Sequence, residues 1–282
     1  MPLVSFVDQL NRARREGWGI PLFDIFERLG TDGIYLAAEA KNAPTIVGVY
    51  GGLFDRPGGK EFCSYFVKRC QTSTVPMSVY LDHGDSFERC IQALHLGFTD
   101  VMYDGSQLPM DENIATTKMV VRAAHAVGAG VEAELGHVGR GSDYESFGSR
   151  REGFTKPEDV ERFIEETGVD FLAIAIGSAH GQYKGTPELD YELLAEISSR
   201  VDIPLVMHGG SGLSDEQFQT AISKGITKVN IFTDLAIAAG ANLIEAARSE
   251  SPNLMVMANA VREGFRVRCE HYLDLFGATD KA

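Results

Sequence analysis

Histidine and carboxylate residues stand where several short apolar runs of the sequence end. His83, His180 and His208 are placed in this way, and Glu134 closes a further run. Neutral imidazoles bind borderline divalent cations such as Zn²⁺, and an open coordination position lets the cation polarise a bound substrate. These residue types therefore predict a catalytic divalent-metal site, provided that the fold brings the ends of the runs together.

The elements that must position these residues are predicted by an alternation of short β-branched runs with longer amphipathic stretches. This alternation is typical of repeated βα units around a parallel sheet. The 282 residues suit a single (β/α)8 TIM barrel, which needs roughly 250 residues and builds its active site at the C-terminal ends of its strands. We therefore expect one α/β domain over residues 1–282. Its eight strands are expected over 19–23, 45–49, 77–81, 100–103, 130–135, 171–176, 204–207 and 228–231, with helices over 87–96, 113–127, 157–167, 190–199 and 214–223.

A single histidine near a strand end is more often a hydrogen-bonded structural residue than a ligand. We accept that interpretation for the three histidines that lie inside expected helices. The agreement of three strand ends reverses it for His83, His180 and His208, whereas for His137 both interpretations stay open. His137 begins the stretch 137–154, which is rich in glycine, serine and charge; so long a connection at the catalytic end is typical of a mobile substrate loop.

The glycine-rich segment 209–212 predicts a phosphate site. It follows the seventh expected strand and precedes an expected helix, so its backbone amides could face an anion at a helix N-terminus. A tight turn would explain the glycines but not the adjacent His208 and Ser211. Asn230 and Thr233 follow the eighth strand and could offer an amide and a hydroxyl to the same anion. In barrels, the loops after these two strands are the frequent phosphate site.

The charge balance argues against nucleic acid as a partner. Lys and Arg number 26 against 40 Asp and Glu, and the formal net charge of -14 repels polyphosphate backbones. The opening residues lack a basic segment followed by a long apolar one, and no run reaches the length of a membrane span. The four cysteines form no CxxC pair. We therefore expect a cytoplasmic protein with reduced thiols and no membrane association.

Six segments that span most of the chain carry the motifs of one enzyme family. They are YLDHG at 80–84, VMYDGS at 101–106, VEAELG at 131–136, AIGSAHG at 175–181, HGGSG at 208–212 and VNI at 229–231. Together they closely resemble the class II, metal-dependent ketose-bisphosphate aldolases, which include fructose- and tagatose-bisphosphate aldolases. The resemblance implies reversible aldol cleavage of a phosphorylated ketose to dihydroxyacetone phosphate and an aldehyde, by a homodimer or homotetramer.

The resemblance also implies roles for single residues. It implies that zinc, or another divalent metal, is bound by His83, His180 and His208, with Glu134 as a nearby or alternative ligand and Asp104 as a support for the metal site. Asp82 is implied as the acid/base that takes the proton from the hydroxyl whose carbon becomes the aldehyde. Cleavage leaves an enediolate, whose negative charge a metal held by neutral imidazoles would stabilise.

The phosphate of the dihydroxyacetone phosphate half is expected to bind through Gly181, Gly209, Ser211 and Thr233. Asn230 could donate to the enediolate oxygen, and Lys184, four residues after His180, could add charge near the phosphate. The resemblance further implies a monovalent cation, Na⁺ or K⁺, near this phosphate. It would be bound by backbone carbonyls, with Gly181 and Gly209 as contributors.

One departure from the family concerns the loop 137–154. In the family, a Glu of this mobile loop transfers a proton at the nascent enediolate carbon, and the matching position here is Ser142. The neighbouring Asp143 or Glu145 could take that role if the loop is rearranged.

The other departures concern the part of the pocket that would hold the aldehyde. Asp24 stands where the family typically has a neutral Asn at the end of the first strand, and a carboxylate there would repel a second phosphate. Tyr50 stands where a small Ser is common, and Phe232 replaces a small or acidic residue. Both enlarge the apolar surface and shrink the pocket. We therefore expect an aldehyde other than glyceraldehyde 3-phosphate.

Two other functional classes stay open. A metal-dependent epimerase of a ketose or ketose phosphate can use the same barrel and metal, and loss of the loop Glu would suit a reaction that re-forms the carbon–carbon bond after rotation. Product analysis separates the two, because an epimerase releases no triose phosphate. A non-catalytic sugar-phosphate-binding protein is disfavoured, because all three metal-site histidines are present together with Asp82.

Overall fold

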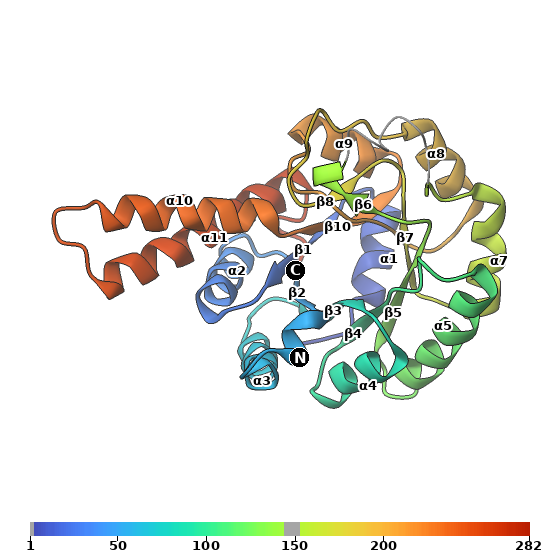
Figure 1. Cartoon of the computed structure of the whole chain (residues 1–282), viewed down its shortest axis with the longest axis horizontal. Coiled ribbons are helices and arrows are strands. Elements are labelled where there is room, and N and C mark those ends of the chain that lie inside the picture. Colours follow the sequence, from blue (N-terminus) through green and yellow to red (C-terminus); the bar gives the residue numbers. More distant parts are fainter. Residues whose placement is uncertain (1–2, 144–152) are drawn as a thin grey trace.

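The computed structural model describes residues 3–143 and 153–282, and its centre is a closed barrel of eight strands (Figure 1). The strands pair in parallel in the order β1-β10-β9-β7-β5-β4-β3-β2, which follows the chain around the barrel. Their bounds are β1 Ile20–Ile25, β2 Thr45–Tyr50, β3 Met77–Gly84, β4 Asp100–Tyr103, β5 Gly130–Leu135, β7 Phe171–Ile174, β9 Leu205–Met207 and β10 Ile226–Ile231. The predicted TIM barrel is confirmed.

Most helices lie around the outside of the barrel, between successive strands, whereas α1 precedes β1 and both α10 and α11 follow β10 (Figure 1). Their apolar residues pack against the strands in one continuous core. The bounds are α1 Val7–Glu16, α2 Arg28–Ala40, α3 Gly59–Cys70, α4 Phe87–His95, α5 Met110–His125, α7 Pro157–Thr167, α8 Tyr191–Arg200, α9 Asp215–Ser223, α10 Thr233–Ala247 and α11 Leu254–Leu275. The described residues also form two short 3-10 helices, η1 Gly51–Asp55 and η2 Gly141–Asp143.

Two strands end at other residues than predicted. β7 ends at Ile174, two residues earlier than expected, because the carbonyls of Ala175 and Ile176 accept hydrogen bonds from the loop amides of Thr155 and Asp190 (3.0 and 2.8 Å). β3 instead runs on to Gly84, and its register with β4 shifts between Leu81 and Gly84. Such an irregularity re-aims side chains at a strand end.

A second, two-stranded sheet was not predicted. β6 (Gly139–Arg140) pairs in parallel with β8 (Ala179–His180). This sheet joins the loop after β5 to the segment that carries His180. A further hydrogen bond from the amide of Lys184 to the carbonyl of Gly141 (2.9 Å) extends the contact. The loop after β5 therefore helps to position a predicted metal ligand.

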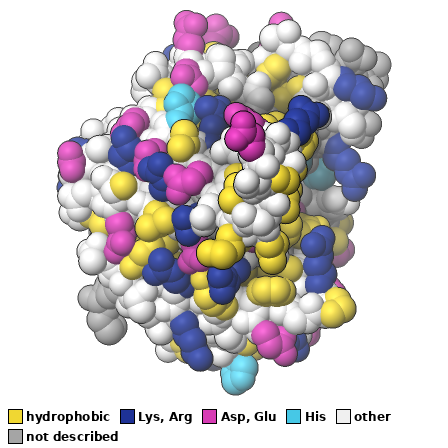
Figure 2. All heavy atoms as spheres, turned by 90° about the vertical axis from the view of Figure 1, so that its left-hand side faces the viewer, with side chains coloured by type: hydrophobic (Ala, Val, Ile, Leu, Met, Phe, Trp, Pro, Cys, Tyr) yellow, Lys and Arg dark blue, Asp and Glu magenta, His cyan; other side chains and the backbone are white. Residues whose placement is uncertain are grey.

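Helices α10 and α11 form a hairpin that projects from the barrel (Figure 1). Its apolar side chains are partly exposed, and Figure 2, which views the molecule from the hairpin side, shows hydrophobic side chains gathered on that face. The exposed members are Ile237, Leu243, Ile244, Leu254, Met255, Val256 and Val267. In the described part of the chain no helix combines the length and the apolar character that a membrane span needs.

Candidate active site

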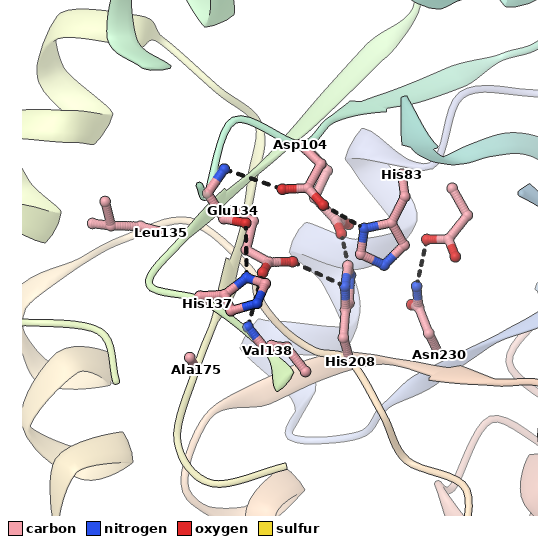
Figure 3. Close-up of polar contacts among 12 residues, drawn as sticks. His83, Asp104, Glu134, Leu135, His137, Val138, Ala175, His208 and Asn230 are labelled. Atoms are coloured by element: carbon pink, nitrogen blue, oxygen red, sulfur yellow. Dashed lines mark hydrogen bonds and ion pairs between the residues drawn. The ribbon is translucent and has the colours of Figure 1, made fainter. Parts of the chain in front are cut away.

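The three predicted metal-binding histidines meet at the C-terminal end of the barrel. Figure 3 shows two of them, His83 and His208. His83 lies near the end of β3, His180 on β8, and His208 directly after β9. The ring centroid of His83 lies 4.9 Å from that of His180 and 4.6 Å from that of His208. One nitrogen from each ring lies within 4.8 Å of the other two. This spacing allows all three imidazoles to face a single ion.

An unusual backbone conformation directs His83 into this cluster. His83 has a φ of 49°, in the left-handed region that residues other than glycine seldom adopt. It lies where the register between β3 and β4 shifts. A Cβ at Gly51 would lie 2.8 Å from the carbonyl oxygen of His83, so a glycine there leaves room for the strained turn. Strain of this kind is typical of functional sites.

His83 and His208 each use one ring nitrogen to bind a carboxylate, and the other nitrogen of each makes no hydrogen bond to a described residue. His83 Nδ1 lies 2.8 Å from Asp104 Oδ2, and His208 Nε2 lies 2.8 Å from Glu132 Oε1. The opposite atoms, His83 Nε2 and His208 Nδ1, are buried and have no hydrogen-bond partner among the described residues. Carboxylates that orient metal-binding histidines are a general feature of metal sites. Asp104 thus supports His83 rather than facing the centre with the same oxygen.

Glu134 completes the donor set. Its Oε1 accepts a hydrogen bond from the amide of Val138 (3.2 Å; Figure 3), whereas its Oε2 is buried without a partner in the described part of the chain. Oε2 lies 3.2 Å from His208 Nδ1. Because this carboxylate oxygen and the imidazole nitrogens converge in a buried space, a divalent cation could join them in place of the proton that pairs His208 with Glu134. The residues present therefore fit a divalent metal.

His180 and His208 differ in their pKa values and therefore in their protonation at pH 7. Burial, followed by the charges of His83 and His208, lowers the pKa of His180 to about 3, so His180 is neutral at pH 7. Burial also opposes protonation of His208. The hydrogen bond with Glu132 and the adjacent carboxylate of Glu134 outweigh that effect and raise the pKa of His208 to about 10. A metal must therefore displace a proton from His208.

Zinc binding is accordingly expected to release about one proton per ion at pH 7, because His208 must be deprotonated before its Nδ1 can act as a donor. Below the pKa of His208, the apparent affinity should rise with pH. Isothermal titration calorimetry in buffers of different ionisation enthalpy counts the released protons. A binding enthalpy that is the same in all buffers at pH 7 would contradict this assignment.

Asp82 lies on β3 beside the histidines and is only 5% exposed. Its Oδ1 accepts a hydrogen bond from Asn230 Nδ2 (2.7 Å). Asp24, on β1, lies close to Asp82, and its Oδ1 has no hydrogen-bond partner among the described residues. Burial, followed by the charge of Asp82, raises the pKa of Asp24 well above its ordinary value. A Cβ at Gly48 would lie 2.3 Å from Asp24 Oδ1, so only glycine leaves room for this carboxyl.

Gly181, Gly209 and Ser211 line the same cavity as His83 and His180, a space of about 920 Å³. Gly181 and Gly209 have positive φ values of 83° and 69°. At Gly209 a side chain is also excluded by contact, because a Cβ would lie 2.3 Å from the carbonyl oxygen of Ala179. Ser211 Oγ accepts from the amides of Phe232 and Asp234 (both 3.3 Å), so it joins the loops after β9 and β10. Thr233 and Asn230 also line the cavity.

Two expected contributors are placed less favourably. Lys184 is exposed and is not among the residues that line the cavity, so a phosphate role for its side chain stays a prediction. The carbonyl of Gly209, expected to help bind a monovalent cation, already accepts a hydrogen bond from Tyr183 Oη (2.8 Å). One of its two lone pairs is therefore used.

Aromatic side chains form the outer part of the cavity. Tyr50 is 59% exposed and lies edge-on to His83, with the ring centroids 6.5 Å apart. Phe232 makes an edge contact with Phe26, with the ring centroids 5.8 Å apart. Tyr50, Phe26 and Phe232 line the cavity together with Asp24. The three departures from the family thus lie around one part of the pocket.

The loop 137–154, predicted to carry an acid, lies partly outside the described residues. Glu145 falls in the segment 144–152, which the structure does not describe, and Asp143 is placed by its backbone alone, at the end of η2. The two ends of the loop meet, since the amide of His137 donates to the carbonyl of Gly153 (2.8 Å).

Two charged residues of the site were missed by the sequence analysis. Glu132 and Lys228 are completely buried, and Lys228 Nζ donates to Glu132 Oε2 (2.8 Å). Glu132 lies two residues before Glu134 on β5, and Lys228 lies two residues before Asn230 on β10. Because side chains two apart on a strand point to the same side, this spacing was the signal that could have found them.

A family model described as fructose-bisphosphate aldolase class-II matches residues 4–281. The chain belongs to the class II fructose-bisphosphate aldolase family. Similar proteins include a probable fructose-bisphosphate aldolase of Bacillus subtilis (strain 168), 37% identical over 289 residues that cover 100% of each chain. A fructose-bisphosphate aldolase of Geobacillus stearothermophilus is 42% identical over 243 residues, which cover 84% of this chain and 83% of that protein.

A solved structure extends the similarity to the whole fold. The YdjI aldolase from Escherichia coli K12 superposes with a TM-score of 0.89 at 32% identity, over 99% of both chains. As a member of the class II aldolase family, the chain is an aldolase, a lyase that cleaves a carbon–carbon bond to give dihydroxyacetone phosphate and an aldehyde.

Proposed function

We propose that the enzyme is zinc-dependent and cleaves a phosphorylated ketose whose aldehyde half is not glyceraldehyde 3-phosphate. The observation that carries this proposal is one cavity that is lined by two kinds of residues. His83, His180, Asp82 and the glycine-rich phosphate loop line it together with the departures Asp24, Tyr50 and Phe232.

Zinc is favoured by the donor set. Three imidazoles and one carboxylate, without a thiolate, suit Zn²⁺, and such a site keeps a position open for substrate. When bound, the metal would polarise the ketose carbonyl and stabilise the negative charge that forms on cleavage. Glu134 would serve as a nearby or alternative ligand.

The chain's own residues supply the proton chemistry. Asp82 takes the proton from the hydroxyl whose carbon becomes the aldehyde, since it is a buried carboxylate in the cavity beside the cluster. Asn230 gives one amide hydrogen to Asp82 and keeps a second for the enediolate oxygen. For proton transfer at the nascent enediolate carbon we propose Asp143 or Glu145, because Ser142 is no acid.

The phosphate of the dihydroxyacetone phosphate half is proposed to bind at Gly181, Gly209, Ser211 and Thr233, which line one side of the cavity. A monovalent cation, Na⁺ or K⁺, would lie beside it. Backbone amides of the two glycines would donate to the phosphate oxygens.

The preference against a second phosphate is expected to depend on Asp24. Asp24 and Asp82 place two carboxyl groups in one buried spot, where the pKa of Asp24 is raised. At a pH above that pKa Asp24 is ionised, and a phosphate beside it meets a repulsion of about 1–4 kcal/mol for a charge pair 4 Å apart. At such a pH the unmodified enzyme should cleave fructose 1-phosphate with a higher kcat/KM than fructose 1,6-bisphosphate. There, Asp24→Asn should shift this ratio toward the bisphosphate by about tenfold or more.

A coupled assay of dihydroxyacetone phosphate over a panel of ketose mono- and bisphosphates tests both statements. Asp85→Asn is the matched control, because Asp85 also lines the cavity but lies exposed and pairs with Arg89. It should leave the ratio unchanged. A clear preference of the unmodified enzyme for fructose 1,6-bisphosphate would sink the proposal.

We also propose that the enzyme works as a homodimer or homotetramer in the cytoplasm. The exposed apolar residues of the α10–α11 hairpin support self-association, because monomers seldom expose a contiguous apolar surface of this kind. All four cysteines are free and buried, which suits a reducing compartment. Sedimentation velocity measures the size of the assembly.

A further inference from the structure

A buried row of polar side chains connects the histidine cluster to Asp82. Glu132 lies at its centre and is completely buried. Its Oε1 accepts from His208 Nε2 (2.8 Å), and its Oε2 accepts from Lys228 Nζ (2.8 Å) and Tyr80 Oη (2.7 Å). One carboxylate is thus shared between a metal-binding histidine and a buried ammonium group.

Lys228 makes the second half of the connection. Its Nζ also donates to Asn230 Oδ1 (2.8 Å), and Asn230 Nδ2 donates to Asp82 Oδ1 (2.7 Å). An ammonium group has donors only, so the oxygen of the Asn230 amide must face Lys228 and the NH₂ group must face Asp82. Without this donor, the amide could rotate and direct its oxygen at the carboxylate.

Stability alone does not account for the buried ion pair of Lys228 and Glu132. Apolar residues of similar volume often stabilise a protein as well as, or better than, a buried ion pair, because two charges must be desolvated. Lys228 also packs over the ring of Tyr80, with Nζ 4.6 Å from the centroid, so every side of its charge is occupied. The pair lies directly beneath the donor atoms of the site, at the catalytic end of the barrel.

Another buried charge provides a comparison. Asp100 is completely buried on β4, and its partners are hydroxyls and amides, including Ser5, Ser78 and the amide of Phe6. These hydrogen bonds attach the segment before α1 to the barrel. They contact neither the histidines nor Asp82. They stabilise the opposite end of the barrel.

We propose that Lys228 is a positioning residue of this aldolase. Its single ammonium group orients the Asn230 amide toward Asp82 and holds Glu132 against His208. The role assigned to Asp82 rests on the proposed function, whereas the effect on the metal site does not depend on which substrate is cleaved.

The test compares Lys228→Met, which keeps an unbranched side chain one atom shorter, with Glu132→Gln and with Asp100→Asn as the matched buried control. Zinc affinity is measured by competition with a chelator. Both site variants should bind zinc about tenfold or more weakly, whereas Asp100→Asn should not change the affinity. Unchanged zinc affinity in Lys228→Met and Glu132→Gln would overturn the inference, whatever the enzyme cleaves.

The kinetic arm is measured at saturating zinc with the ketose phosphate that the unmodified enzyme cleaves fastest. Lys228→Met should lower kcat by about tenfold or more, because added zinc does not restore the orientation of Asn230, and should change KM less. In an Asn230→Ala background the same substitution should lower kcat no further, since residues that act as a unit are not additive. An equal fold-loss in both backgrounds would show that Lys228 acts without Asn230.

A double variant that leaves no buried charge unpaired serves as the control for misfolding. Lys228→Met combined with Glu132→Gln removes both charges, so it should fold where Lys228→Met alone does not. At saturating zinc its kcat should stay low, and full activity would refute the positioning role. If the unmodified enzyme releases no triose phosphate from any ketose phosphate, the proposed function fails, and the zinc measurements still decide the inference.

Discussion

His208→Ala is expected to lose its metal and its aldolase activity together, with kcat/KM lower by about a thousandfold or more, since metal-ion catalysis contributes several kcal/mol. His208 presents a buried, unpartnered Nδ1 beside Glu134 Oε2, and Glu132 holds its other nitrogen. Removing the ring deletes one of three imidazole donors and leaves two buried carboxylates facing an empty space.

Zinc per chain, measured by mass spectrometry of the purified protein, and the rate of ketose cleavage are the two readouts. His125→Ala is the matched control, because His125 is a partly exposed histidine of α5 that pairs with Asp170 away from the cavity. The control should keep both zinc and activity. Unchanged turnover in His208→Ala would overturn the ligand assignment.

Asp82→Asn is expected to separate the proton chemistry from metal binding. The variant should retain about one zinc per chain, while kcat falls by about 10²–10⁴-fold, the range typical of a lost general acid or base. The substitution preserves the size of the side chain but removes its ability to accept a proton. It also places an amide opposite the Asn230 NH₂ group, in place of the carboxylate that accepts its hydrogen bond.

Activity of Asp82→Asn within about tenfold of the unmodified enzyme would contradict the role of Asp82. Loss of zinc together with activity would contradict the separation of the two functions. Asp85→Asn, three residues further along the chain, controls for the loss of a negative charge near the cavity.

The barrel could be predicted from the sequence because each strand is a short, continuous apolar run. Strands of a parallel barrel are buried on both faces, and the loop chemistry at their ends is visible in the sequence. The meeting of His83, His180 and His208 followed from the topology alone. The strained turn at His83 could not be predicted, since it depends on the shift between β3 and β4 and on the space left by Gly51.

The connection through Glu132 and Lys228 could not be predicted as a pair. Their strands are far apart in the sequence, and in the barrel β9 and β7 separate β10 from β5. Burial of each charge is tolerated only because the other lies 2.8 Å away. The pairing of β6 with β8 was missed for a related reason, because two residues in each strand are too few for any pattern.

The residues around the aldehyde half were recognised by their departure from the family, and the structure groups them physically. Asp24, Tyr50 and Phe232 come from the ends of β1, β2 and β10, and all line one cavity. Gly48 shows that the site is built around Asp24, since any side chain there would collide with its carboxyl. We therefore expect substrate choice to depend on these three side chains, which the barrel holds in place.

The most direct test of the central claim is the product of the unmodified enzyme. The zinc-loaded protein is incubated with fructose 1-phosphate and other ketose phosphates, and dihydroxyacetone phosphate and remaining ketose are quantified together. We predict that one dihydroxyacetone phosphate appears for each ketose consumed. Conversion of the ketose to an epimer, without release of dihydroxyacetone phosphate, would contradict the account.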